Sequence, residues 1–213
     1  MEDKQNNLIS SLRDHPLIIV IRLENDFFSD SKKRDKLLIK IKNLSNLGIK
    51  NIEIGWDSNP EWINLMSDIK NDFHSINLGA ASICSIDALN ATSSLNLSYS
   101  MSPHFKKGIH LKAIKYNQLL IPGISNIESF KEAIKLGYKI IKIYPVSNLG
   151  MRFLDKLKEL QRSDIFFIGA GGIGSKDIKN LLDNGYNALV IGKELKNQIP
   201  DKDLNIWLKN LKK

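Results

Sequence analysis

The sequence predicts a single-domain α/β protein folded as a (β/α)8 barrel, the TIM-barrel arrangement. Short apolar runs alternate with amphipathic segments, and over most of the chain successive runs begin roughly 21–25 residues apart. The residue types able to carry chemistry fall at the carboxyl ends of the runs, where barrel active sites are built. No Pro- or Ser-rich linker divides the 213 residues, so residues 1–213 are expected to form one domain.

Eight apolar runs have the composition of buried strands. They lie at residues 17–22, 51–55, 75–80, 97–101, 118–121, 139–144, 165–169 and 187–192. Segments with helical periodicity lie near residues 31–47, 60–72, 84–94, 106–116, 126–136, 150–161 and 174–184. Further helices are expected near 3–13 and 203–212. Such a chain can also form an open, doubly wound sheet, and the position of the chemical groups favours the closed barrel.

Glycines mark the ends of three predicted helices. Gly48, Gly137 and Gly185 each follow a helical segment, and a strand begins within a few residues. A glycine at this place suits a left-handed helix C-cap. The pattern therefore supports helices that lead directly into the next strand.

Composition and charge exclude several classes of protein. Hydrophobic residues make up 42% and charged residues 25%, which is typical of a soluble globular domain. The net charge of 31 − 23 = +8 raises the question of an anionic partner. The lysines of the chain lie mainly on predicted amphipathic helices, so we interpret most of them as part of the solvent-exposed helix faces. No module or basic–aromatic pattern typical of nucleic-acid binding is present.

The chain also lacks the sequence marks of export or membrane insertion. Cys84 is the only cysteine, which excludes an intramolecular disulfide framework and suits a reducing compartment. No apolar run reaches the roughly 18 residues of a membrane span. The polar start, MEDKQNNLIS, has no apolar signal core. We therefore expect a cytoplasmic protein.

Lys142 lies within the run KIIKIYP, near the carboxyl end of a predicted strand. Alternation puts Ile141 and Ile143 on one face and Lys142 with Tyr144 on the other. If the isoleucines pack outward, Lys142 projects into the barrel, where loss of hydration lowers its pKa and favours the nucleophilic amine. A lysine on an edge strand that reaches water is the alternative. The strand alone leaves both open.

Glu53 is predicted to share this interior. In NIEIGW the residues Ile52, Ile54 and Trp56 fall on one face, and Glu53 faces the opposite way. Burial raises the pKa of a carboxyl and lets it move protons near neutral pH, whereas a nearby ammonium lowers that pKa. The sequence does not decide which effect is larger. A structural ion pair between Glu53 and Lys142 is the alternative.

The glycine-rich stretch GAGGIGS, residues 169–175, follows an apolar strand and precedes a predicted helix. Free backbone N–H groups at such a helix start favour phosphate. The stretch also spells a dinucleotide fingerprint, but that motif belongs at the first strand of its fold, and only one strand follows here. Loops after barrel strands 7 and 8 commonly hold phosphate, and Ile191-Gly192-Lys193 would be the second of them. A tight turn without a ligand is the alternative.

From about Pro16 to Leu195 the order of segments resembles the bacterial aldolases of 2-keto-3-deoxy-6-phosphogluconate and 4-hydroxy-2-oxoglutarate. The segments are PLIIVIR ending at Arg22, IEIGW with Glu53, LGAAS ending at Ser82, SMSPHF with Pro103, IPGIS at 121–125, IKIYP with Lys142, and GAGGI at 169–173. The resemblance implies a class I aldolase of carbohydrate metabolism, a homotrimer that needs no metal and no other cofactor. It would cleave a 2-keto acid, such as phosphorylated 2-keto-3-deoxy-gluconate or 4-hydroxy-2-oxoglutarate, to pyruvate and an aldehyde.

The resemblance also implies roles for particular residues. Lys142 would be the Schiff-base lysine, and Glu53 the general acid/base that works through water. The residues that would contact substrate are Arg22, Ser82, Pro103, Tyr144, Gly171, Gly172 and Lys193. Among these, Ser82 stands in place of a threonine that touches the pyruvate carboxylate, and the two glycines match the phosphate-binding pair.

Several positions depart from the family pattern. Asp57 replaces an arginine that binds the substrate carboxylate, and Arg22 is the candidate substitute. Lys193 replaces a phosphate-binding serine, and Ser147 replaces a glutamate. Because of Asp57, a barrel that binds a phosphorylated metabolite without turnover is the main alternative. A phosphate-binding barrel with other chemistry, such as a thiazole-phosphate or indole-glycerol-phosphate enzyme, is the next, and nucleic-acid binding is the least favoured.

Overall fold

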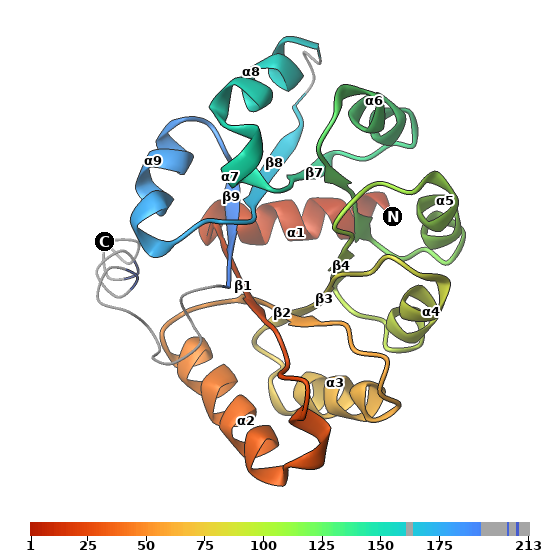
Figure 1. The fold of residues 1–213 in the computed structure, drawn as a ribbon, viewed down its shortest axis with the longest axis vertical. Helices are drawn as coiled ribbons and strands as arrows, with labels where there is room; N and C mark the ends of the chain where they lie inside the picture. Colours follow the sequence, from red (N-terminus) through yellow and green to blue (C-terminus); the bar gives the residue numbers. More distant parts are fainter. Residues whose placement is uncertain (161–163, 193–203, 205–207, 209–213) are drawn as a thin grey trace.

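The computed structural model describes residues 1–160, 164–192, 204 and 208, and its strands there form one parallel sheet in the order β5-β4-β3-β2-β1-β9-β8-β7-β6 (Figure 1). The strands are β1 (Leu17–Ile21), β2 (Asn51–Gly55), β3 (Asn77–Ala81), β4 (Tyr99–Met101), β5 (Leu120–Ile121), β6 (Gly123–Ile124), β7 (Ile140–Ile143), β8 (Phe166–Ala170) and β9 (Ala188–Ile191). The first and last strands of this order, β5 and β6, are neighbours in the sequence, so the sheet curls into a nearly closed barrel. The predicted (β/α)8 fold class is thereby confirmed.

β5 and β6 together occupy the fifth strand position, or stave, of the barrel, and Pro122 separates them. β5 pairs with β4 through Leu120 and Ser100, and β6 pairs with β7 through Gly123 and Lys142. Proline has no N–H to donate, which interrupts the ladder between the two short strands. The Pro122 carbonyl still accepts from the Lys142 backbone N–H at 3.0 Å and links the two sides. The predicted run 118–121 is therefore one half of a broken stave that ends at residue 124.

Helices surround the strands, as the ring of coils in Figure 1 shows. They are α2 (Ser31–Asn46), α3 (Glu61–Asp72), α4 (Ile86–Ser94), α5 (Lys107–Lys115), α6 (Ile127–Lys135), α7 (Val146–Leu149), α8 (Met151–Leu160) and α9 (Ile178–Asp183), with the short 3-10 helices η1 (Phe27–Ser29) and η2 (Ser175–Asp177). Gly48, Gly137 and Gly185 have positive φ, in agreement with their predicted capping role. The helix predicted near 203–212 lies, apart from two residues, outside the described part of the chain.

Two predicted helices differ from those observed. The segment predicted at 150–161 is preceded by the additional short helix α7, and Gly150, with φ of 66°, separates α7 from α8. The segment predicted at 174–184 begins as η2 and becomes α-helical only at Ile178. There the Asp177 carboxylate accepts from the Gly174 N–H at 2.8 Å, so a side chain already occupies one amide of this helix start.

Apolar residues pack in two layers on either side of the strands. The inner cluster fills the barrel and includes Ile18, Val20, Met101, Ile140 and Ile168. The outer cluster lies between strands and helices and contains the outward-facing residues of the same strands, among them Ile52, Ile54, Ile141 and Ile143. The alternation of faces read from the sequence is therefore present in β2 and β7.

Helix α1 (Glu2–Asp14) closes the amino-terminal end of the barrel, and Figure 1 shows it lying across the ring of strands. Leu8 and Leu12 join the inner cluster. The buried Gln5 side chain accepts from the Lys139 N–H at 2.7 Å and donates to the Gly137 carbonyl at 3.1 Å, directly before β7. The amino-terminal end is thus filled, which leaves the carboxyl ends of the strands as the accessible side. No helix among the described residues is both long enough and apolar enough to cross a membrane.

Candidate active site

A cavity of about 1270 Å³ opens at the carboxyl ends of the strands. Its inner wall contains most of the residues singled out in the sequence: Arg22, Glu53, Ser82, Pro103, Lys142, Tyr144, Gly171 and Gly172. Lys193 lies outside the described residues, although its neighbour Gly192 lines the same cavity. Residues from seven segments, far apart in the chain, therefore meet at one end of the barrel.

Lys142 points into the barrel from β7 and is 7% exposed. Its ammonium lies 5.5 Å from the centre of the Tyr144 ring, which comes from the same face of the strand. The pKa of Lys142 is lowered to about 8, chiefly by burial; the negative charge of Glu53 opposes this, and Arg22 contributes a smaller lowering effect. A larger fraction of the amine is therefore unprotonated at neutral pH than on a surface lysine, which is the form able to attack a carbonyl.

Glu53 points inward from the opposite wall. Going either way around the barrel, three staves separate β2 from β7. Glu53 is 2% exposed, and burial raises its pKa to about 7, against the smaller lowering effects of Lys142 and Arg22. The sequence left open whether burial or the neighbouring charge has the larger effect on the pKa of Glu53. In the structure, burial has the larger effect on the pKa of both Glu53 and Lys142.

The structural ion pair considered as the alternative is not formed. No ion pair of 4.0 Å or less joins Glu53 to Lys142 among the described residues, and the Glu53 Oε1 atom has no hydrogen-bond partner there. The two groups face the cavity from opposite sides of the barrel. A substrate carbon chain held in that space would meet an amine on one side and a proton-transfer group on the other.

Arg22 and Ser82 form a polar corner at the rim. The Arg22 Nη1 donates to the Ser82 Oγ at 3.2 Å. Ser82 follows directly after β3 and has φ of 67°, a left-handed conformation that is uncommon for a residue with a side chain. Such strain concentrates at ligand-binding sites. A guanidinium beside a hydroxyl is a suitable pair for a carboxylate.

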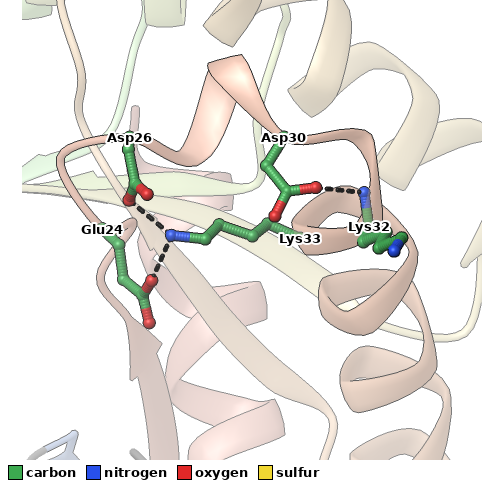
Figure 2. Close-up of polar contacts among 5 residues, drawn as sticks. All are labelled: Glu24, Asp26, Asp30, Lys32 and Lys33. Carbon is green, nitrogen blue, oxygen red and sulfur yellow. Dashed lines mark hydrogen bonds and ion pairs between the residues drawn. The ribbon is translucent and has the colours of Figure 1, made fainter.

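The loop that carries Arg22 is fixed to helix α2 by a lysine with two acidic partners. Figure 2 shows the Lys33 ammonium between the carboxylates of Glu24, at 2.6 Å, and Asp26. These contacts raise the pKa of Lys33, chiefly through Asp26, and lower that of Asp26. Asp30 caps the same helix by accepting from the Lys32 N–H at 2.9 Å. The β1–α2 connection thus forms an ordered outer wall of the cavity.

The lysines of α2 were interpreted from the sequence as a solvated face, and the structure adds that three of them, of which Lys36 is exposed, lie beside the cavity. Lys33, Lys36 and Lys40 line the outer part of the cavity. Their spacing of three and four residues puts them on one side of the helix. This regular spacing was the available signal, but a charged stripe facing a cavity has the same pattern as one facing water.

Asp57 does not line the cavity, contrary to the expectation that it reverses the charge of the substrate pocket. Its carboxylate accepts from the Asn59 N–H at 2.8 Å and stabilises the turn between β2 and α3. Short-range bonding of this kind is common for aspartate in turns. The neighbouring Trp56 packs edge-on against Trp62, with ring centres 4.8 Å apart, which helps to fix the turn.

Gly171 and Gly172 follow β8 with φ of 88° and 74°. A Cβ on Gly171 would lie 2.8 Å from the Tyr144 ring, and one on Gly172 would lie 2.5 Å from the Ser147 side chain. Both the backbone conformation and the lack of space therefore require glycine here. Two successive left-handed residues with their amides at a cavity wall are the kind of backbone that can hold an anion.

No group of three or more histidine, cysteine, aspartate or glutamate side chains in the described part of the chain is placed to hold a metal ion. The chemistry available in the cavity is that of an amine, a carboxyl, a guanidinium, hydroxyls and backbone amides.

Comparisons with known proteins agree with this arrangement. A family model described as KDPG and KHG aldolase matches residues 8–205. The 2-dehydro-3-deoxy-6-phosphogalactonate aldolase of Escherichia coli K12 is 22% identical over 162 residues, which cover 76% of this chain and 78% of that protein.

Two solved structures illustrate the likeness in fold. KDPG aldolase from Legionella pneumophila, with pyruvate captured as a covalent carbinolamine intermediate, has a TM-score of 0.76 at 19% identity over 95% of each chain. The enzyme of Zymomonas mobilis ZM4 with 3-phosphoglycerate has a TM-score of 0.73 at 18% identity, over 95% of this chain and 94% of that one.

Proposed function

Because the chain belongs to the KDPG and KHG aldolase family of carbon–carbon lyases, we propose that it is a class I aldolase that cleaves a 2-keto acid through a Schiff base on Lys142. One observation supports this most directly. An amine and a carboxyl, both buried and unpaired with each other, face one cavity from opposite walls, and burial brings both pKa values toward neutrality. The products are pyruvate and an aldehyde.

The reaction begins when the Lys142 amine attacks the C2 carbonyl carbon. Loss of water from the resulting carbinolamine gives an iminium cation. The C4 hydroxyl then gives up its proton to Glu53 through water, the C3–C4 bond breaks, and its electron pair moves to the iminium nitrogen. This step releases the aldehyde and leaves an enamine. Protonation at C3 restores the iminium, and water hydrolyses it to pyruvate and the free amine.

The rim of the cavity suggests how the substrate is held. Arg22 and Ser82 offer a guanidinium and a hydroxyl for the carboxylate. The amides of Gly171 and Gly172 would bind a phosphate at the other end, with Lys193 as a further candidate. The substrate class is thus a phosphorylated 2-keto acid of the 3-deoxy-sugar type, or the shorter 4-hydroxy-2-oxoglutarate. The likeness of this chain to a phosphogalactonate aldolase and to an enzyme solved with 3-phosphoglycerate supports a phosphorylated substrate.

The alternative of a binding protein without turnover was favoured only by Asp57. That carboxylate is engaged in its own turn and does not line the cavity, so it brings no negative charge to the site, and Arg22 offers a guanidinium in place of the arginine missing at position 57. We also propose the homotrimer that the family resemblance implies. Light scattering on the full chain would give three times 24.1 kDa for a trimer.

A retro-aldol assay tests the proposed activity. The protein is given a panel of 2-keto acids, with and without a phosphate group, and pyruvate release is followed by a coupled reaction. We expect turnover by the wild type and by Lys36→Ala, which removes an exposed lysine of the same cavity, and none by Lys142→Ala. Wild-type turnover in Lys142→Ala would reject the Schiff base and favour a barrel with other chemistry.

A further inference from the structure

Two of the buried polar atoms without a hydrogen-bond partner lie next to the candidate active site. Among the described residues, neither the Tyr99 hydroxyl nor the Glu53 Oε1 atom makes a hydrogen bond. Tyr99 is fully buried and Glu53 is 2% exposed. Buried polar groups are almost always satisfied, so an unpartnered hydroxyl next to a functional carboxyl requires an explanation.

Strand register brings the two residues into one row. Glu53 on β2 pairs with Gly79 on β3, and Gly79 pairs with Tyr99 on β4. Side chains at paired positions of neighbouring parallel strands lie on the same face of the sheet. Tyr99 belongs to the inner cluster, so this row faces the barrel interior, where Glu53 also lines the cavity.

Gly79 leaves the space that the Tyr99 ring occupies. A Cβ on Gly79 would lie 2.5 Å from the Tyr99 Cζ and 2.6 Å from its Cε2. The end of the ring therefore lies over the backbone of the middle strand. Because the hydroxyl is bonded to Cζ, it continues across the row from β4 toward β2, where Glu53 stands.

The charged groups that act on Glu53 and Tyr99 decide which of the two can donate a hydrogen bond. Glu53 is faced by Lys142 from β7 and by Arg22 from the end of β1, and both cations favour its ionised form. Tyr99 is faced by the Glu53 carboxylate, which raises the pKa of its hydroxyl in addition to the larger effect of burial. The hydroxyl therefore keeps its proton and acts as a donor.

We propose that Tyr99 is a positioning residue for Glu53, and that its hydroxyl donates through one buried water molecule to the Glu53 carboxylate. A water in this interior needs two or more polar partners, and the two unpartnered atoms supply them. A donor directed at a carboxylate favours its charged form, so Tyr99 keeps the pKa of Glu53 lower than burial alone would set it. The inference rests on the proposed function, since it assigns the proton transfer to Glu53.

Infrared titration of the Glu53 carboxyl tests the inference without any need for turnover. The protonated C=O band of Glu53 is identified by its loss in Glu53→Gln, and its pH midpoint is measured in wild type and in Tyr99→Phe. Removal of the hydroxyl is expected to raise the midpoint by about 1. An unchanged midpoint in a folded Tyr99→Phe protein would overturn the inference.

Tyr186→Phe is the matched control. Tyr186 is also buried with an unpartnered hydroxyl among the described residues, but it belongs to the outer cluster, away from Glu53. We expect its removal to leave the Glu53 midpoint where it is in the wild type. An equal rise in both variants would show a general effect of losing a buried hydroxyl and would contradict a specific link between Tyr99 and Glu53.

The pH profile of turnover separates this inference from the proposed function. In an active enzyme, the acid limb of kcat should move to higher pH in Tyr99→Phe by the same amount as the infrared midpoint. A wild type without aldolase activity would reject the proposed function, while the titration of Glu53 would still decide the role of Tyr99. An active enzyme whose acid limb and infrared midpoint are both unmoved would reject the inference alone.

Discussion

Glu53 and Lys142 gain their chemical properties from the same cause, burial, although it moves their pKa values in opposite directions. The carboxyl becomes a weaker acid and the ammonium a stronger one. Each group also favours the charged form of the other. Removing the Glu53 carboxylate should therefore lower the pKa of Lys142.

We expect Glu53→Gln to separate Schiff-base formation from cleavage. Loss of a general acid/base typically lowers kcat about 10²–10⁴-fold. Because the negative charge of Glu53 raises the pKa of Lys142, its removal should lower that pKa and leave reduction-trapped pyruvate adducts at least as abundant near neutral pH. The measurement is kcat together with the adduct yield from mass spectrometry. Equal loss of both would contradict separate roles for the two residues.

At the scale of elements, the carboxyl ends of the strands supply the reactive groups, and the connection between β1 and α2 supplies the outer wall. Lys33 holds this connection through Glu24 and Asp26, as Figure 2 shows. Arg22, at the start of the same connection, reaches Ser82 across the rim. The order of this loop should therefore matter for substrate binding more than for bond cleavage.

We predict that Lys33→Met raises KM for the keto acid several-fold and changes kcat little, since the loop that positions Arg22 loses its link to α2. Lys32→Met is the control, because its side chain makes neither of the contacts to Glu24 and Asp26. Steady-state kinetics of both variants at one salt concentration give the comparison. A fall in kcat with unchanged KM would show that Lys33 acts on the chemistry instead.

Over the whole molecule, the sequence was sufficient for the barrel and for the strand face on which each key side chain lies, whereas the inward direction of Lys142 stayed one of two alternatives until the structure placed it in the interior. Alternation along these strands put Glu53 opposite Ile52 and Ile54, and Lys142 opposite Ile141 and Ile143, because one face of each strand must contact the helices. It was not sufficient for features that depend on contacts between distant segments. The split stave at Pro122, the cavity-facing lysines of α2 and the turn-bound Asp57 are of this kind.

The stability of the whole fold should depend on pH through His110. This fully buried residue contacts the Ser102 Oγ at 3.2 Å and the Tyr138 hydroxyl at 2.9 Å. Burial lowers its pKa to about 4 from 6.5. Since the folded state binds a proton less readily than the unfolded chain, the stability present above about pH 6.5 is lost as the pH falls toward 4.

We expect the free energy of unfolding to fall by about 3 kcal/mol more in the wild type than in His110→Gln between pH 7 and pH 4. Urea unfolding at a series of pH values measures this difference, and comparison of the two proteins removes the opposite contribution of Glu53. His74→Asn, at an exposed position, should follow the wild type. Parallel curves for wild type and His110→Gln would contradict a neutral buried histidine.

Schiff-base chemistry in this barrel depends on Lys142 being a buried amine that is reactive near neutral pH. Pyruvate with cyanoborohydride, applied between pH 6 and pH 10 and followed by peptide mapping, tests this most directly. The predicted result is one dominant adduct, on Lys142, whose rate of formation rises with a midpoint near pH 8. Adducts spread over the surface lysines with a midpoint near 10.4, or no adduct on Lys142, would contradict it.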